Sequence, residues 1–333
     1  MLKIGIKHYP FLRFHHNGPQ VFMHRLTKAF IKEKIFKINS LLLPNYDIGL
    51  FSVTKAGVYD IPYFLRLDGL YIDNKNTKVD SNLENKKIFD SIRNAKGIIF
   101  QSEYCKQITE KLYPSQINQP SIVINNGVPL DIFNPFGNNF RSKLNLQKKE
   151  KVLITSAHWR RHKRLQETIT LINILNEGNQ EKYKLIILGK TNLQRKYENN
   201  KNLIFAGEIE PHNLATWYRT ADVYIHLAWI EPAGNTQNEA IGCGLPVVCS
   251  NNGGLKETVI RADAGLVSLT DNIFDYNFVD YYNPPEPNYS NILRDIKYIF
   301  KNLDLFKSRI KYNEIDINSV AKNYEKFIKE NFK

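Results

Sequence analysis

The sequence has few cysteines and no long hydrophobic run. Its three cysteines, Cys105, Cys243 and Cys249, form no disulfide framework and no Cys-x-x-Cys zinc motif, which favours a reducing compartment. No stretch reaches 18 uncharged apolar residues, and the longest candidate, 46–65, contains three charged side chains, so we expect no membrane-spanning helix. Lysines interrupt the apolar residues of segment 1–16, and no small-residue cleavage site follows, so we expect no secretory signal peptide. These absences together predict a cytoplasmic protein.

What is present is the composition of a globular chain. Hydrophobic residues make up 42% and charged residues 24% of the sequence, which excludes a disordered or fibrous chain. The 333 residues exceed what one core usually fills, so we expect two domains of about 150 residues each.

The positive charge is concentrated in the first half. The chain carries +13, of which residues 1–150 contribute +10 and residues 151–333 contribute +3. This indicates an anionic partner for the first half: phosphate, nucleic acid or an acidic membrane surface. Solvated charge from a lysine-rich composition explains it equally well, and the 37 asparagines point to such a bias.

Short β-branched runs alternate with helical stretches on both sides of a polar, turn-rich segment, 134–150, which we interpret as a linker. Alternating strands and helices predict parallel sheets, so the fold class is α/β with two doubly wound domains. The expected strands are 2–7, 47–53, 62–67, 97–101 and 121–125, then 151–156, 184–188, 202–205, 223–226 and 246–250; the expected helices are 20–34, 164–177, 212–220 and 235–242.

Two segments near the C-terminus complete the pattern. Segment 281–291 is proline-rich and predicts an extended connection, whereas 316–332 predicts a helix. That helix has one apolar stripe, which must pack on a partner surface. The stripe contains Ile317, Val320, Ala321, Tyr324, Phe327 and Ile328.

The most informative segment is 231–247, EPAGNTQNEAIGCGLPV. We expect Gly234 to let backbone approach a ligand, and the free N–H groups of Asn235 and Thr236 at the helix start to face a diphosphate. A carboxylate accepts two hydrogen bonds, so Glu239 suits a ribose diol and Glu231 suits sugar hydroxyls. The alternative is that both are ordinary glutamates at a helix terminus.

Taken as a whole, this string resembles the donor site of family 4 glycosyltransferases, which have the GT-B fold. The likeness lies in Glu-x7-Glu-Ala followed by Gly-x-Pro-Val, and it covers most of residues 90–330. Four further segments resemble that family in the right order: INNGVPLDIFNP at 124–135, with Pro129 where Asp is usual; GIIFQSEYCKQIT at 97–109; FAGEIEPHNLATWYRTAD at 205–222; and NNGGLKE at 251–257.

The resemblance implies two Rossmann-like domains facing across a cleft, with a C-terminal helix that crosses back to the first domain. We expect an acceptor-side domain over 1–140, a donor domain over 150–311 and the returning helix over 312–333. The implied activity is a retaining transfer of a sugar from a nucleotide diphosphate sugar. The resemblance implies no metal and no cofactor, because cationic side chains and a helix dipole act on the leaving diphosphate.

The cations are expected from HWRRHKRL at 158–165. Lys163 matches the family lysine that heads a helix, and the resemblance makes it catalytic with Glu231. The family arginine would fall on His158 or the residue before it, so Arg160 or Arg161 must substitute, and we assign Arg160 to the diphosphate. The alternative for this cluster is a nucleic-acid patch, which the scarcity of interleaved aromatic residues disfavours. We therefore expect no nucleic-acid partner.

The same resemblance places Gly207 beside the base and Gly253 and Gly254 along the sugar phosphate. Gly18, in the segment HHNGP at 15–19, corresponds to a family glycine loop near the diphosphate. The sequence does not identify the nucleotide.

The acceptor side is expected at LRLDGLY, residues 65–71. Arg66 and Asp68 stand at the end of a strand, where acceptor-site polar residues usually lie, and we assign Asp68 a catalytic role. The histidines at 8, 15, 16 and 24 have no spacing typical of a closed metal site, so hydrogen-bonded or surface histidine is favoured over metal ligation. Cys105 is expected to pack without a chemical role.

The helix near residues 20–37 carries several basic side chains beside its apolar face. Many relatives glycosylate lipid-linked acceptors, and a basic amphipathic surface would suit peripheral association with the inner face of a membrane. The alternative is a core helix with a solvated face. The expected partners are thus a nucleotide-sugar donor and a glycan or lipid-linked acceptor.

Two other functions remain open at this point. One is a GT-B-fold enzyme of another reaction, such as a nucleotide-sugar epimerase. The other is a non-enzymatic basic protein that binds nucleic acid or membrane, for which steep salt dependence without sugar turnover would be the signature.

Overall fold

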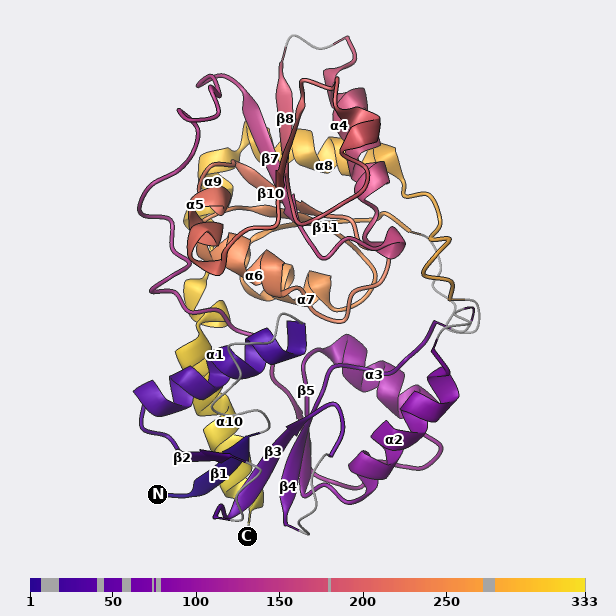
Figure 1. The fold of residues 1–333 in the computed structure, drawn as a ribbon, viewed down its shortest axis with the longest axis vertical. Coiled ribbons are helices and arrows are strands. Elements are labelled where there is room, and N and C mark those ends of the chain that lie inside the picture. Colours follow the sequence, from indigo (N-terminus) through magenta and orange to yellow (C-terminus); the bar gives the residue numbers. More distant parts are fainter. Residues whose placement is uncertain are drawn as a thin grey trace. The chain divides into compact units, whose positions relative to one another are not determined.

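The chain forms two compact α/β units (Figure 1). The computed structural model describes residues 1–6, 18–40, 45–55, 61–73, 75, 79–178, 181–271 and 279–332. Unit 1 comprises Met1–Pro129, Tyr276–Val279 and Ile315–Lys333, and unit 2 comprises Leu130–Asp275 and Asp280–Glu314. The α/β prediction with two doubly wound domains is confirmed, and each unit is described below by itself.

Unit 1 is built on a six-stranded parallel sheet with the order β2-β1-β3-β4-β5-β6. The four inner strands are short and mostly buried, as parallel strands are, whereas the two edge strands are more exposed. They are β1 (Lys3–Ile6), β2 (Lys37–Ser40), β3 (Ile48–Ser52), β4 (Tyr63–Leu67), β5 (Gly97–Phe100) and β6 (Ser121–Val123).

Helices pack on both faces of this sheet. Successive strand residues point to opposite faces, and β4 shows both: the Tyr63 hydroxyl donates to the Ser91 carbonyl of α2 at 2.7 Å, whereas the Phe64 ring meets Phe327 of α10 at 5.6 Å. Ser102 caps α3 through a hydrogen bond from the Cys105 N–H. The helices are α1 (Gly18–Lys32), α2 (Ser81–Arg93), α3 (Glu103–Leu112) and α10 (Ile317–Asn331).

Helix α10 returns to unit 1 from the far end of the sequence. Its whole predicted apolar stripe is buried in the unit 1 core together with the apolar face of α1. Gly127 permits the approach, because a Cβ there would lie 2.9 Å from the Cα of Ile317. The prediction of a C-terminal helix that crosses back to the first domain is therefore confirmed.

Unit 2 holds a second six-stranded parallel sheet, with the order β12-β11-β10-β7-β8-β9. Strands β7 and β10 have the bounds expected from the sequence. The strands are β7 (Lys151–Ser156), β8 (Tyr183–Leu188), β9 (Leu203–Gly207), β10 (Val223–His226), β11 (Val247–Ser250) and β12 (Gly265–Ser268).

Two sets of helices cover the unit 2 sheet. Ile225 of β10 faces the core beneath α4 and α8, and its neighbour Tyr224 points toward α6 on the other face. The helices are α4 (Leu165–Asn176), α5 (Leu214–Tyr218), α6 (Asn235–Gly242), α7 (Leu255–Arg261), α8 (Tyr289–Lys301) and α9 (Leu303–Arg309).

The segment interpreted as a linker, 134–150, belongs to unit 2. Arg141 forms an ion pair with Asp222 at 3.2 Å and donates to the carbonyls of Thr220 and Glu150. The division between the units falls after residue 129 instead. A polar, turn-rich composition fits an ordered segment on a domain surface as well as it fits a linker.

Among the described strands and α-helices, hydrophobic patterning did not indicate seven: β2, α2, α3, α7, β12, α8 and α9. Strand β12 extends the sheet beyond residue 250, where the resemblance placed the last core strand. Helix α8 begins at Tyr289, inside the segment expected to be extended, because the Asn288 side chain accepts the Asn291 N–H and starts a helix there.

Candidate active site

The strand order of unit 2 reverses between β7 and β10, which are neighbours although two strands separate them in sequence. In an open parallel sheet, ligands bind in the crevice at the carboxyl ends of the strands where this reversal occurs. The residues that follow β7 and β10 are therefore the first candidates for a binding site. They contain Lys163 and Glu231, respectively.

These two side chains meet. The Lys163 ammonium contacts the Glu231 carboxylate in an ion pair, and the side chains are 14% and 19% exposed. A short 3₁₀ turn, Arg161–Lys163, positions the lysine just before α4, and its N–H donates to the Arg160 carbonyl at 2.9 Å. Sequence reasoning thus named two catalytic candidates that the fold brings into direct contact.

Burial and the charge of Arg160 lower the pKa of Lys163 to about 7. Glu231 opposes this shift, since a carboxylate favours the charged ammonium. Two histidines also lie near Lys163, and burial lowers the pKa of both His162 and His226 to about 3. Both imidazoles are therefore neutral near pH 7. The neighbouring positive charge that acts on Lys163 at that pH is that of Arg160.

His226 ends β10, and neither of its ring nitrogens has a hydrogen-bond partner in the described part of the chain. The sequence analysis placed it in a strand and gave it no role. A buried imidazole with two unsatisfied nitrogens is unusual. Nothing in the local sequence VYIH distinguishes it from an ordinary core residue.

A glycine pair fixes the backbone at Glu231. Gly253 has a φ of +76°, and a Cβ there would lie 2.3 Å from the Glu231 carbonyl oxygen. The Gly254 N–H donates to that same oxygen at 2.8 Å. The resemblance placed both glycines along the sugar phosphate, which stays a prediction; in the structure they hold the loop that carries Glu231.

Glu239 lies on α6 and is 3% exposed. The Tyr218 hydroxyl donates to its carboxylate at 3.0 Å, and burial, then the charge of Glu239, raise the pKa of Tyr218 well above its ordinary value. Tyr218 was not named as a site residue, although it lies in the family-like segment 205–222. It orients the carboxylate that we assigned to a ribose.

The start of α6 is partly built as expected. Thr236 directs its hydroxyl to the Ser156 carbonyl at 3.1 Å and also contacts the Tyr224 hydroxyl at 2.9 Å. Of Thr236, therefore, only the backbone N–H would face an anion, together with that of Asn235. Gly234 has a packing reason as well, because a Cβ there would lie 2.7 Å from the Leu255 side chain.

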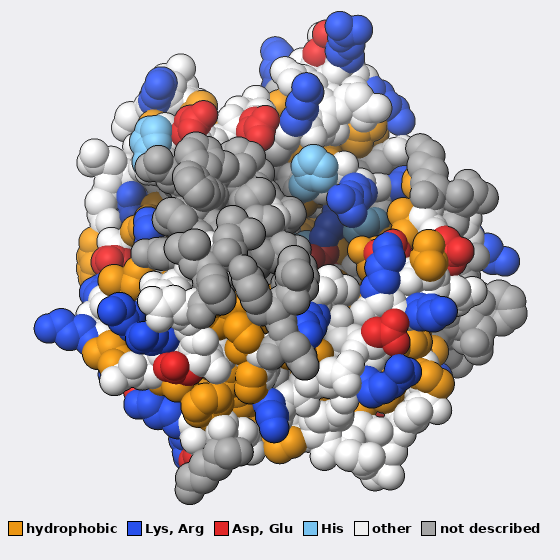
Figure 2. All heavy atoms as spheres, turned by 60° about the horizontal axis from the view of Figure 1, so that its bottom comes forward, with side chains coloured by type: hydrophobic (Ala, Val, Ile, Leu, Met, Phe, Trp, Pro, Cys, Tyr) orange, Lys and Arg blue, Asp and Glu red, His pale blue; other side chains and the backbone are white. Residues whose placement is uncertain are grey.

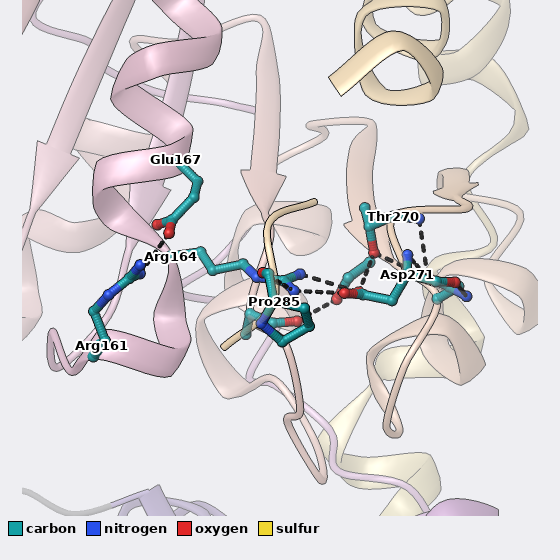
Figure 3. Close-up of polar contacts among 9 residues, drawn as sticks. Arg161, Arg164, Glu167, Thr270, Asp271 and Pro285 are labelled. Carbon is teal, nitrogen blue, oxygen red and sulfur yellow. Dashed lines mark hydrogen bonds and ion pairs between the residues drawn. The ribbon is translucent and has the colours of Figure 1, made fainter. Parts of the chain in front are cut away.

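Gly207 and Arg160 lie on other loops of unit 2. Gly207 ends β9 with a φ of +71° and open space where a Cβ would be, and its carbonyl accepts the Gly189 N–H at 2.6 Å. Arg160 is exposed and lines a cavity of about 500 Å³ beside Trp159. Arg161, the alternative cation, is paired with Glu167 at 2.5 Å (Figure 3).

The acceptor-side residues behave differently from expectation. Arg66 is completely buried in β4, where it donates to Gln101 at 2.9 Å and to Asn126 at 2.8 Å and lies over the Phe22 ring. It is therefore a structural arginine of unit 1 and not an exposed acceptor-site group, because its strand position points inward.

Asp68 follows β4 and is 16% exposed. It pairs with Arg66, and burial raises the pKa of its carboxyl group, while Arg66 opposes that shift. Its backbone carbonyl accepts from the Cys105 thiol at 3.2 Å, so Cys105 packs here. The catalytic assignment of Asp68 stays a prediction.

Gly18 is the first residue of α1 and is exposed. The histidines at 8, 15 and 16 lie outside the described residues. Across the described ranges, no three His, Cys, Asp or Glu side chains are placed to hold a metal ion together.

The apolar face of α1 is buried in unit 1, as the core-helix alternative predicted. On the face drawn in Figure 2, Lys and Arg side chains are spread out, with hydrophobic, acidic and uncharged groups between them. None of the described helices is long and apolar enough to cross a membrane.

Comparisons with known proteins show what this chain resembles. Residues 136–276 match the family model described as glycosyl transferases group 1. Alpha-monoglucosyldiacylglycerol synthase of Streptococcus pneumoniae is 30% identical over 120 residues, which are 34% of this chain and 27% of that protein. The chain spans about a quarter of the length of the curated relatives it matches.

Two solved structures share the fold of the whole chain. Sucrose-phosphate synthase from Thermosynechococcus elongatus has a TM-score of 0.76 at 14% identity, with 100% of this chain and 99% of that chain covered. Anabaena HepE, solved with UDP and glucose, has a TM-score of 0.68 at 13% identity, with 99% and 100% covered.

The fold and the family match define the class. The chain has the GT-B architecture, and residues 136–276, which match the group 1 model, include the Lys163–Glu231 pair. The predicted class of enzyme, a glycosyltransferase, is supported by the match, which spans Glu239 as well.

Proposed function

We propose that the protein is a glycosyltransferase that moves a sugar from a nucleotide diphosphate sugar to a glycan or lipid-linked acceptor. The observation that carries this proposal is the Lys163–Glu231 ion pair at the strand reversal of unit 2. Glu239 on α6 lies in the same unit, within the segment that matches the group 1 model.

Four side chains divide the donor between them. Lys163 and Arg160 neutralise the diphosphate, and the N–H groups at the start of α6 add the positive end of a helix dipole. Glu239, oriented by Tyr218, accepts the ribose hydroxyls, and Glu231 accepts sugar hydroxyls. Since Glu231 also contacts Lys163, the sugar-binding and diphosphate-binding groups are coupled.

The catalytic effect depends on where negative charge develops during sugar transfer. As the sugar–oxygen bond breaks, negative charge grows on the leaving diphosphate, and a fixed cation stabilises it more in the transition state than in the ground state. We propose that this cation makes a divalent metal unnecessary. We also propose retention of the anomeric configuration, on the family resemblance alone.

We propose the donor and acceptor classes from two of the similar proteins. Anabaena HepE was solved with UDP and glucose, and the streptococcal relative is a glucosyldiacylglycerol synthase by name. A UDP-hexose donor and a lipid-linked acceptor are therefore the first pair to test. The basic residues of α1 would favour an anionic membrane surface near such an acceptor.

A thermal-shift panel of UDP, GDP and ADP tests the donor assignment. The correct nucleotide at about 100 times its Kd should add roughly 2.7 kcal/mol of stability. Turnover of the matching nucleotide sugar is then followed with and without EDTA, and the anomeric proton of the product is read by NMR. Loss of activity in EDTA that magnesium restores would refute metal independence, and an isomerised sugar nucleotide without transfer would identify an epimerase.

A further inference from the structure

The residue after Lys163 is a buried arginine in an unusual backbone conformation. Arg164 has φ 54° and ψ 43°, the left-handed region, and its side chain is fully buried. Residues other than glycine seldom adopt this conformation, and it persists only where surrounding contacts hold it. The contacts that hold Arg164 therefore also fix the turn that presents Lys163.

The guanidinium of Arg164 has a paired, bidentate partner. It donates to the two carboxylate oxygens of Asp271 at 3.0 and 2.5 Å and to the Pro285 carbonyl at 2.7 Å. Figure 3 shows the side chain running from the start of α4 to Asp271, with Pro285 beside it. Two parallel hydrogen bonds to a carboxylate give directional precision as well as attraction.

Asp271 in turn is joined to Asn251. The Thr270 hydroxyl donates to the Asp271 carboxylate at 2.7 Å, and the Asp271 N–H donates to the Asn251 side chain at 3.1 Å. Asn251 returns a hydrogen bond to the Asp271 carbonyl at 3.1 Å. We call Arg164, Asp271, Thr270 and Asn251 the Arg164 network.

The Arg164 network connects the two loops of the active site. Asn251 begins the short loop whose Gly253 and Gly254 hold the backbone of Glu231. At its other end, Arg164 is bonded through the chain to Lys163. A path of hydrogen bonds and short backbone links thus runs from one member of the Lys163–Glu231 pair to the other.

His162, the residue before Lys163, is anchored to segment 281–285, to which Arg164 is also bonded. The His162 ring lies against the Tyr281 ring, with centroids 4.5 Å apart, and its carbonyl accepts the Trp229 N–H at 2.8 Å. Lys163 is therefore flanked by two residues that are both fixed to segment 281–285.

We propose that Arg164 is a positioning residue for catalysis: through Asp271 and Asn251 it sets the Lys163 ammonium against Glu231 and the donor diphosphate. This inference rests on the proposed function. It predicts an effect that passes through Lys163, because the Arg164 side chain is fully buried and paired with Asp271.

A double-mutant cycle tests this directly. Arg164→Gly suits the left-handed backbone while it removes the guanidinium. It should lower kcat for nucleotide-sugar turnover by about tenfold or more, because small displacements of a catalytic group are costly, and leave the donor KM within about twofold. In a Lys163→Ala background the same change should cost almost nothing further.

Conservative variants supply the controls. Arg164→Lys keeps the charge but loses the planar guanidinium that makes two parallel hydrogen bonds. Its kcat should fall between those of wild type and Arg164→Gly. Arg309 makes a similar two-bond pair with Asp263 on the surface of unit 2, at 3.1 and 2.9 Å, and Arg309→Lys should leave kcat unchanged. Asp271→Asn serves if Arg164→Gly does not fold.

The outcomes are distinguishable. Wild-type protein that turns over no nucleotide sugar refutes the proposed function and this inference with it. If the wild type is active but Arg164→Gly lowers kcat by the same factor in the wild-type and Lys163→Ala backgrounds, only the positioning role is overturned. A variant with a lowered melting temperature and an unchanged kcat also overturns it.

Discussion

Unit 1 and unit 2 both have six parallel strands, but they use buried charge differently. In unit 2 the order reverses between β7 and β10, and the Lys163–Glu231 pair stands at that reversal. In unit 1 the reversal lies between β1 and β3, whereas the buried Arg66 follows neither strand. The Lys163–Glu231 pair is partly exposed where its sheet reverses, whereas Arg66 is fully buried and hydrogen-bonds to Gln101 and Asn126 within unit 1.

The largest effect should come from removing residues 312–333. Besides Ala321, five sizeable buried side chains of α10 would leave the unit 1 core, at about 1.5–3 kcal/mol each when fully buried. We expect unit 1 to unfold, seen as a lost or strongly lowered melting transition in calorimetry. Tyr282→Ala, an exposed aromatic residue, is the control and should change little. An unchanged melting temperature for the truncated chain would contradict the packing of α10.

Arg66→Ala should destabilise unit 1 by about 3–5 kcal/mol, because it leaves the largely buried Asp68 carboxylate without its cationic partner. Urea unfolding measures this. Arg93 is the control: its pair with Asp90 is exposed, so Arg93→Ala should cost less than about 1 kcal/mol. If Arg66→Ala is as stable as wild type, the structural role of this buried charge is wrong.

Lys163→Ala should lower activity and hardly affect stability, the opposite of what we expect for Arg66→Ala. We expect turnover to fall by about two orders of magnitude or more, the scale of losing one transition-state donor, with only a small change in melting temperature. Lys182→Ala, an exposed lysine of unit 2, should retain full turnover. A Lys163→Ala variant that unfolds instead would show that this charge also serves the fold.

The two glutamates should separate binding from turnover. Glu239→Ala should weaken nucleotide binding by about tenfold, since a hydrogen bond to a charged group contributes about 1.5–3 kcal/mol. Glu231→Ala should mainly lower kcat. Calorimetric titration and steady-state kinetics on both variants check this. Equal nucleotide affinity in wild type and Glu239→Ala would contradict the ribose assignment.

The smallest effect is a pH dependence. Lys163 is charged below its lowered pKa of about 7, and a bound diphosphate favours the charged form. The kcat/KM for the nucleotide sugar should therefore be highest below pH 7 and fall as pH rises above it, by at most about tenfold per unit. Lys163→Met removes the titrating group and should give a flat profile from about pH 6 to 9. The neutral His162 and His226 do not titrate in this range.

Periodicity and motif order were sufficient for the fold. The structure places Lys163, Glu231 and Glu239 after strands of one parallel sheet, whose carboxyl ends lie together, and their roles stay predictions. The sequence patterns that named them were the family likeness around Lys163 and the Glu-x7-Glu spacing. They could not reveal Tyr218 or Asp271 as partners, because these contacts join residues far apart in sequence. The inward direction of Arg66 was equally hidden, since a short buried strand lacks alternation.

The return of α10 to unit 1 has a consequence for synthesis. Unit 2 is nearly continuous in sequence, whereas the unit 1 core needs residues 315–333, which leave the ribosome after unit 2 is made. Domains generally fold as units in the order of their emergence, but here the first unit waits for the second. Until then, the apolar face of α1 and the sheet beneath it stay uncovered, so a nascent chain that ends before α10 exposes a surface for chaperones or aggregation.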